Sequence, residues 1–173
     1  DYAKKQYMIT GMDGETFGHH RPGLQRVLTE LLISKDFGHV FFSELPELFS
    51  TTVEVTPRTC TWASTEKDIE DGVQFLTWKD EKNQVHTWQW ELQALALARV
   101  TAHRDDSAKK SARMKLDQAL ASDQFFWASA RPWWSLEVVE RGAWMLLDTI
   151  KSVPSIEPEK LEQAEKLYQN IIS

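Results

Sequence analysis

The sequence predicts an α/β fragment followed by a mainly α-helical bundle. Runs of β-favouring residues bounded by glycine or turn signals lie in the first 55 residues. From residue 84 onwards, apolar residues recur at helical spacing towards the C-terminus. We therefore expect three parts: a terminal β/α part over residues 1–55, an irregular connection over 56–83 and a helical C-terminal domain over 84–173.

The first part combines candidate strands with short helices. Strands are predicted over residues 5–11, 39–43 and 52–55, where β-branched and aromatic side chains are concentrated. A helix is predicted around Pro22, which suits a first helical turn, and Ser43 is predicted to cap a second, short helix. Two or three scattered strands do not make an independent sheet, so we expect the natural protein to continue upstream of this sequence.

Four long helices are predicted in the C-terminal part. The first runs from Val85 to about His103, and the second follows the polar residues 105–107, which offer N-cap side chains. Ser135 is predicted to cap the third helix, and the fourth begins near Pro158. Helices of this length with one apolar face predict a bundle.

Charge and composition argue against several classes of protein. A net charge of −6 does not suit general binding to nucleic acid, which needs a basic surface. No apolar run approaches the roughly 20 residues that cross a bilayer, so no membrane partner is expected. Cys60 is the single cysteine, which rules out an internal disulfide and fits a cytoplasmic location. No cofactor is predicted.

Tryptophan is unusually frequent in this chain. Some of the indoles are expected to fill the core, because large aromatic side chains bury much apolar surface. The alternative is that several line a sugar site, since aromatic faces stack on the C–H faces of pyranose rings. The eight residues are Trp62, Trp78, Trp88, Trp90, Trp127, Trp133, Trp134 and Trp144.

The first candidate site follows the first predicted strand. If that strand continues through Asp13 and Glu15, both carboxylates face one side, because residues i and i+2 do so in a strand. Carboxylates at a strand end suit acid–base chemistry, and His19 and His20 follow as hydrogen-bond donors. The alternative is a turn with two solvated acids. Neighbouring residues of an extended chain point to opposite sides, so the two histidines rarely ligate one ion and no metal site is predicted. The alternative is a partial metal site that they form together with Asp13 and Glu15.

Residues 13–19, Asp-Gly-Glu-Thr-Phe-Gly-His, resemble the fourth conserved region of glycoside hydrolase family 57. That region reads Asp-x-Glu-x-Phe-Gly, often followed by His, and lies at the end of a late strand of an incomplete (β/α)7 barrel. Its Asp is the family's catalytic acid/base, so the resemblance implies this role for Asp13. We expect Glu15, His19 and His20 to contact the substrate. The family commonly has Trp after the His, whereas this chain has His20.

Residues 122–127, Ser-Asp-Gln-Phe-Phe-Trp, resemble the fifth conserved region of the same family, which has Ser-Asp followed by aromatic residues. In the family this segment belongs to a helical part that folds back over the active site. The resemblance therefore implies that Asp123, Phe126 and Trp127 bind substrate and exclude water. The first three conserved regions, which include the one that holds the Glu nucleophile, are not found in this sequence.

Together the two motifs imply a retaining glycoside hydrolase or glucanotransferase that acts on α-glucans. Such enzymes use two carboxyls about 5 Å apart, and Asp13 would first protonate the leaving oxygen and then activate water or an acceptor sugar. The missing N-terminal part of the same catalytic domain would supply the nucleophile, so the isolated chain is predicted to be inactive. Two alternatives remain open: a metal-dependent polysaccharide deacetylase-like enzyme and a non-catalytic helical interaction domain.

Overall fold

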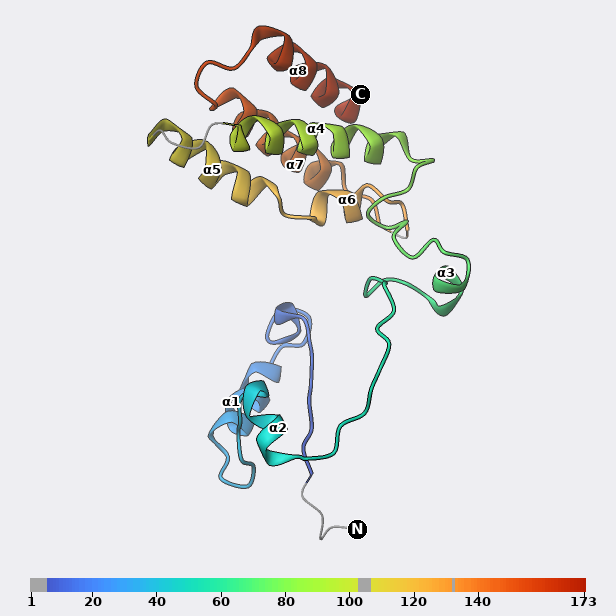
Figure 1. The fold of residues 1–173 in the computed structure, drawn as a ribbon, viewed down its shortest axis with the longest axis vertical. Coiled ribbons are helices and arrows are strands. Elements are labelled where there is room, and N and C mark those ends of the chain that lie inside the picture. The colour runs from blue at the N-terminus through green and yellow to red at the C-terminus, as the bar shows by residue number, and fades with distance from the viewer. Residues whose placement is uncertain (1–5, 103–106, 132) are drawn as a thin grey trace. The chain divides into compact units, whose positions relative to one another are not determined.

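The structure is a computed structural model that describes residues 6–102, 107–131 and 133–173. It divides into an N-terminal unit that ends at Thr56 and a helical unit over Pro57–Ser173, each of which we describe by itself (Figure 1). In the described residues the β structure amounts to one isolated bridge between Phe17 and Arg21. The predicted α/β class, with the end of an incomplete (β/α)7 barrel, is therefore wrong, and the fold is a helical bundle.

The three predicted strands fail for the same physical reason. Residues 6–13, 38–41 and 49–61 have no regular secondary structure and form no ladder with any other described segment. A strand is stabilised by hydrogen bonds to a neighbouring strand and by cross-strand side-chain pairs, and local β propensity cannot replace them. These segments are therefore irregular in spite of their strand-like composition.

In residues 6–56, the part of the N-terminal unit that the structure describes, there are two 3-10 turns and two short helices. They are η1 (Gly14–Thr16), α1 (Leu24–Ile33), η2 (Phe42–Glu44) and α2 (Leu45–Leu48). The helix predicted near Pro22 forms, but Gly23 is its N-cap, with a positive φ of 96°. Ser43 lies inside η2, and Glu44 is the N-cap of α2, so the cap predicted at Ser43 is wrong. No described residue of this unit is buried.

The described residues of the helical unit contain the four predicted long helices and two short ones. Asp105 and Asp106, predicted to offer N-caps, and His103, the predicted helix end, lie outside the described residues. The helices of the unit are α3 (Glu66–Glu70), α4 (Gln84–Thr101), α5 (Ser107–Ala119), α6 (Asp123–Trp127), α7 (Leu136–Lys151) and α8 (Pro158–Ile172).

Side-chain caps explain where two of these helices begin. The Ser135 hydroxyl accepts a hydrogen bond from the Val138 amide at 3.4 Å, so the predicted cap of α7 is confirmed. The Asn83 side-chain oxygen accepts from the Val85 amide at 3.0 Å and from the His86 amide at 3.4 Å. Both caps satisfy amides of the first turn that have no partner inside the helix.

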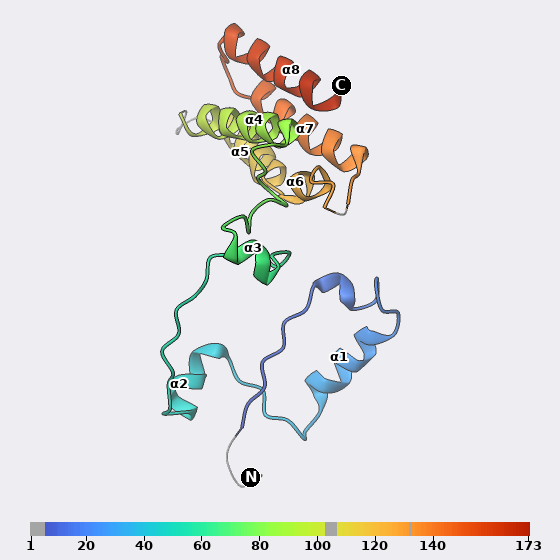
Figure 2. The ribbon, with the colours of Figure 1, turned by 90° about the vertical axis from the view of Figure 1, so that its right-hand side faces the viewer.

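Helix α7 lies at the centre of the bundle and contacts α4, α5, α6 and α8 (Figures 1 and 2). Its apolar face meets the apolar faces of α4, α5 and α8, and this burial is the main source of stability of the unit. None of the described helices is both long and apolar enough to cross a membrane. The larger core side chains are Leu92, Leu95, Val100, Leu116, Val139, Leu146, Leu147, Ile150, Leu167 and Ile171.

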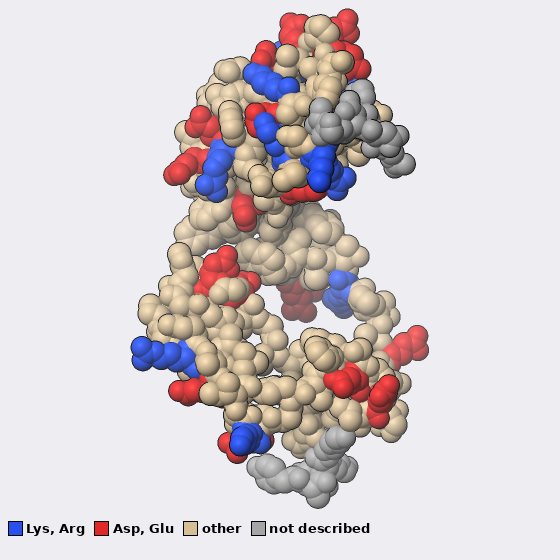
Figure 3. Space-filling model, turned by 90° about the vertical axis from the view of Figure 1, so that its left-hand side faces the viewer, with Lys and Arg blue, Asp and Glu red and all other residues tan. Residues whose placement is uncertain are grey.

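Ion pairs connect the bundle helices at their surfaces. Lys115 of α5 contacts Asp148 of α7 at 2.6 Å, and Lys151 of α7 contacts Glu165 of α8 at 2.8 Å. On the face shown in Figure 3, acidic and basic side chains are interspersed over the surface. These pairs are partly exposed to solvent, so each contributes little to stability, at most about 1 kcal/mol.

Candidate functional site

The motif around Asp13 forms a compact turn on the surface of the N-terminal unit. Asp13 is the N-cap of η1, and its carbonyl oxygen accepts a hydrogen bond from the Thr16 amide at 3.0 Å. The Glu15 carbonyl oxygen accepts from the amides of His19 and His20, and the two imidazole rings meet edge to face at 4.8 Å. Asp13, Glu15, His19 and His20 are all exposed.

This turn changes how the two carboxylates are related. The prediction that Asp13 and Glu15 face one side depended on a continuous strand, and residues 14–16 form a 3-10 turn instead. The strand-based argument for paired carboxylates is therefore wrong. Among the residues that the structure describes, no group of three or more His, Cys, Asp or Glu side chains lies close enough together to hold a metal ion.

The second motif forms helix α6 in the helical unit. Asp123 is exposed in its first turn, whereas the Phe126 and Trp127 side chains are partly buried. The structure thus places the predicted substrate-binding residues Asp123, Phe126 and Trp127 on one short helix. Gln124 and Phe125, between them, are buried against the bundle. Gln124 also lies against Gly142 of α7, where an added Cβ atom would approach its side chain to 2.5 Å, so only glycine allows α6 to pack this closely.

Three side chains from the start of α4 hold α6 in place. The Asn83 amide nitrogen donates to the Ala128 carbonyl at 2.8 Å, and the Gln89 amide nitrogen donates to the Gln124 carbonyl at 3.0 Å. His86 Nε2 lies 2.9 Å from the Phe125 carbonyl oxygen. Spaced by three residues along α4, these side chains share one helical face and satisfy three carbonyls at the α6 end of the unit.

The contacts of His86 fix its tautomer. The Asp80 amide donates to Nδ1 at 3.0 Å, so Nδ1 is unprotonated and Nε2 carries the proton that is donated to Phe125. Burial lowers the pKa of His86 below its ordinary value of 6.5, although the Phe125 carbonyl and the Asp80 carboxylate oppose this shift. A second proton at Nδ1 would break the bond to the Asp80 amide.

We expect the helical unit to lose stability on acidification through His86. Its folded-state pKa lies below that of the unfolded chain, so below about pH 6.5 the unfolded state binds more protons and the free energy of unfolding falls. The stability that neutral His86 contributes is complete above pH 6.5. It declines as the pH falls towards the folded-state pKa of His86, and below that pKa the free energy of unfolding no longer changes through this residue. Urea unfolding at pH 7.5, 6.5, 5.5 and 5.0 measures this slope.

The control is His86→Gln, which cannot ionise in this range. Its unfolding free energy is expected to vary less between pH 7.5 and pH 5.5 than that of the unmodified chain. His39→Gln is the matched control, because His39 is an exposed histidine of the N-terminal unit. An identical pH slope in the unmodified chain and His86→Gln would contradict the assignment.

An aromatic cluster surrounds α6. We use this term for Trp62, Trp78, Phe126, Trp127 and Trp133. Phe126 lies at the centre, with its ring 5.4 Å from Trp62, 5.6 Å from Trp78 and 5.8 Å from Trp127. Trp127 in turn contacts Trp133 at 5.9 Å. Trp62 is 79% exposed and Trp133 is 53% exposed, so the cluster offers indole surface to solvent rather than closing as a core.

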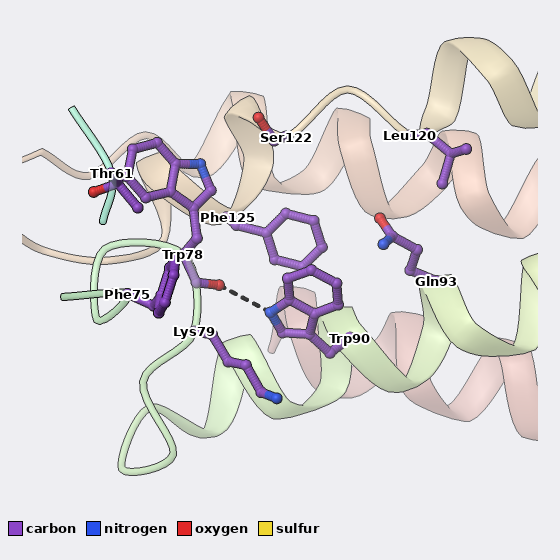
Figure 4. Close-up of a pocket in the computed structure, with 9 residues that line it drawn as sticks. All are labelled: Thr61, Phe75, Trp78, Lys79, Trp90, Gln93, Leu120, Ser122 and Phe125. Atoms are coloured by element: carbon purple, nitrogen blue, oxygen red, sulfur yellow. Dashed lines mark hydrogen bonds between the residues drawn. The ribbon is translucent and has the colours of Figure 1, made fainter. Parts of the chain in front are cut away.

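A pocket of about 410 Å³ lies beside this cluster, within the size range of small-molecule sites (Figure 4). Trp90 and Phe125 form its stacked centre, with ring centroids 4.5 Å apart, and the Trp90 indole nitrogen donates to the Trp78 carbonyl at 2.9 Å. We call this site the aromatic pocket. Its lining residues are Thr61, Phe75, Trp78, Lys79, Trp90, Gln93, Leu120, Ser122 and Phe125.

The pocket is adjacent to the predicted substrate-binding residues but does not coincide with them. Of the lining residues, Ser122 directly precedes Asp123 in the chain, and Phe125 directly precedes Phe126. Sequence reasoning did not identify Gln93 as a site residue. The available signal was a polar side chain one residue after Leu92, on a helix whose neighbouring residues are largely apolar.

Comparison of this chain with protein-family profiles, with curated proteins and with solved structures finds no match.

Proposed function

We propose that the chain belongs to a retaining glycoside hydrolase or glucanotransferase that acts on α-glucans. Two features support the proposal. The first is the resemblance of residues 13–19 and 122–127 to two conserved regions of glycoside hydrolase family 57. The second, which carries it, is the aromatic cluster around Phe126: its exposed indole faces at Trp62 and Trp133 suit the stacking of pyranose rings.

In this proposal the two motifs have different tasks. Asp13 is the acid/base, and its exposed carboxyl is free to meet a glycosidic oxygen. The α6 segment binds the sugar through Phe126 and Trp127, with Asp123 as an acceptor for sugar hydroxyls. Retaining chemistry needs a second carboxylate as the nucleophile. It would come from outside these 173 residues, from the N-terminal part of the same catalytic domain, in a protein that we place in the cytoplasm.

We expect the 173-residue chain to bind maltoheptaose without hydrolysing it. Trp62→Ala and Phe126→Ala each remove a stacking surface and are expected to raise the dissociation constant about tenfold, equivalent to about 1.4 kcal/mol. Calorimetric titration gives the affinity, and a reducing-sugar assay with amylose is expected to remain at background.

The matched control is Trp144→Ala on α7. Trp144 is 53% exposed but lies outside the aromatic cluster, so its removal should leave the affinity unchanged. If the unmodified chain shows no affinity for maltoheptaose, or if Trp144→Ala weakens binding as much as Trp62→Ala, the aromatic cluster is not a glucan site. Release of reducing sugar by the isolated chain would contradict the assignment of the nucleophile to another segment.

A non-catalytic helical interaction domain is the second candidate. One observation favours it: the core of the helical unit is formed by its own helices α4, α5, α7 and α8, and the unit does not contain Asp13. A helical unit that binds glucan, in a natural protein whose activity is unaffected by changes at Asp13, would support this candidate over the first.

A further inference from the structure

The amide oxygen of Gln93 has an unusual environment for a polar atom. Gln93 lines the aromatic pocket, and its amide oxygen Oε1 is buried and has no hydrogen-bond partner among the described residues. A buried acceptor without a partner is unfavourable, because it loses its hydrogen bonds to water and gains none in return. Gln74, Gln89 and Gln124 also have unpaired buried oxygens, but none of these three lines the pocket.

The rest of the pocket is arranged to receive a ring. Trp90 cannot turn freely, because it is stacked on Phe125 and its indole nitrogen is bonded to the Trp78 carbonyl. It nevertheless keeps 36% of its surface exposed. Such a fixed aromatic face binds with little loss of side-chain entropy. In Figure 4 the labelled polar ends of Lys79, Gln93 and Ser122 lie around this stacked pair.

The apolar lining and the unpaired Gln93 oxygen together define the chemistry of a ligand that fits the aromatic pocket. Most of the accessible wall is apolar, with polar ends only at a few positions, so the ligand must present apolar faces. Gln93 Oε1 is an acceptor, so the ligand must also present a donor at its edge. A pyranose ring meets both conditions, because its C–H faces are apolar and its hydroxyls are equatorial donors. An apolar ring would leave Gln93 unpaired.

We propose that the aromatic pocket binds one glucose residue of an α-glucan, and that Gln93 selects it by accepting a hydrogen bond from a ring hydroxyl. This inference rests on the proposed function for the identity of the sugar. It adds a second contact region to the aromatic cluster, and it assigns to Gln93 a specificity-determining role.

The first test uses calorimetric titration of the 173-residue chain with maltotriose. Gln93→Met keeps a side chain of similar length but removes the acceptor, and it is expected to weaken binding at least tenfold. Gln169→Met is the matched control, because Gln169 is an exposed glutamine on α8 that does not line the pocket, and its affinity should equal that of the unmodified chain.

The second test identifies the hydroxyl. Methyl α-glucosides that lack one hydroxyl at position 2, 3, 4 or 6 are titrated against the unmodified chain and Gln93→Met. One of the four is expected to bind the unmodified chain about tenfold more weakly than the parent glucoside, and to bind Gln93→Met with the same affinity as the parent. No such loss, or a loss of equal size in both proteins, would overturn the role of Gln93.

A third measurement does not depend on any variant being folded. In the unmodified chain, the side-chain amide resonances of Gln93 and the indole resonance of Trp90 are expected to shift on addition of maltotriose. Binding with shifts confined to Trp62 and Trp133 would overturn the inference but leave the proposed function standing. Absence of binding to any glucan would overturn both.

Discussion

Asp13→Asn is expected to lower kcat on amylose by about 10²–10⁴-fold in the natural protein that supplies the nucleophile. The amide cannot give a proton to the leaving oxygen and cannot take one from the attacking water, so both steps of a retaining mechanism lose their acid/base. KM is expected to change little, because the proposed sugar contacts lie on other residues. Reducing-sugar release under saturating substrate measures the effect.

Two comparisons separate a chemical role of Asp13 from a structural one. A glucoside with a p-nitrophenolate leaving group needs little protonation, so its glycosylation step should be far less sensitive to Asp13→Asn than that of amylose. Asp36→Asn is the matched control, because Asp36 is another exposed aspartate of the N-terminal unit. Equal amylose rates for Asp13→Asn and the unmodified protein would show that Asp13 is not the acid/base.

The helices of the bundle could be predicted because their information is local. Val85, Trp88, Leu92 and Leu95 repeat at a spacing that places them on one side of α4. In the structure Leu92 and Leu95 belong to the core, and Val85 and Trp88 pack against it. Ser135 and the Val138 amide lie three residues apart, so the cap of α7 is also a local feature.

The errors concern interactions that no local pattern encodes. The segments around Tyr7 and Val40 have β-favouring side chains, but a strand exists only if another strand pairs with it, and none of the described residues does so. The three side chains that hold α6 in place were not predicted, for a related reason. The partners of Asn83, His86 and Gln89 are backbone carbonyls that lie 45, 39 and 35 residues further along the chain. Every residue has such a carbonyl, so the sequence does not indicate which ones accept these hydrogen bonds.

The aromatic residues were predicted only as a class. Their number indicated either a core or a sugar site, and composition could not assign individual indoles. In the structure Trp88 packs against the core, whereas Trp62 is largely exposed beside Phe126. The difference arises from the position of each residue: Trp88 lies on the inner side of a long helix, and Trp62 lies on the irregular segment that precedes α3.

Leu146→Ala is expected to lower the free energy of unfolding of the helical unit by about 2–5 kcal/mol. Leu146 is fully buried on α7, the helix that contacts α4, α5, α6 and α8, so truncation leaves a cavity where several helices meet. All eight tryptophans lie in the helical unit, so urea unfolding followed by indole fluorescence reports on this unit, and circular dichroism at 222 nm follows both units.

Leu32→Ala on α1 is the matched control, and it tests the division of the chain. Leu32 is 60% exposed in a unit whose described residues include no buried side chain, so its truncation should change the free energy of unfolding by no more than about 0.5 kcal/mol by either probe. If Leu32→Ala lowered the free energy of unfolding as much as Leu146→Ala, the apolar face of α1 would be buried in solution. The N-terminal unit would then have side chains packed in a core. The turn that carries Asp13 would in that case be held by a packed unit and would not be an isolated surface turn.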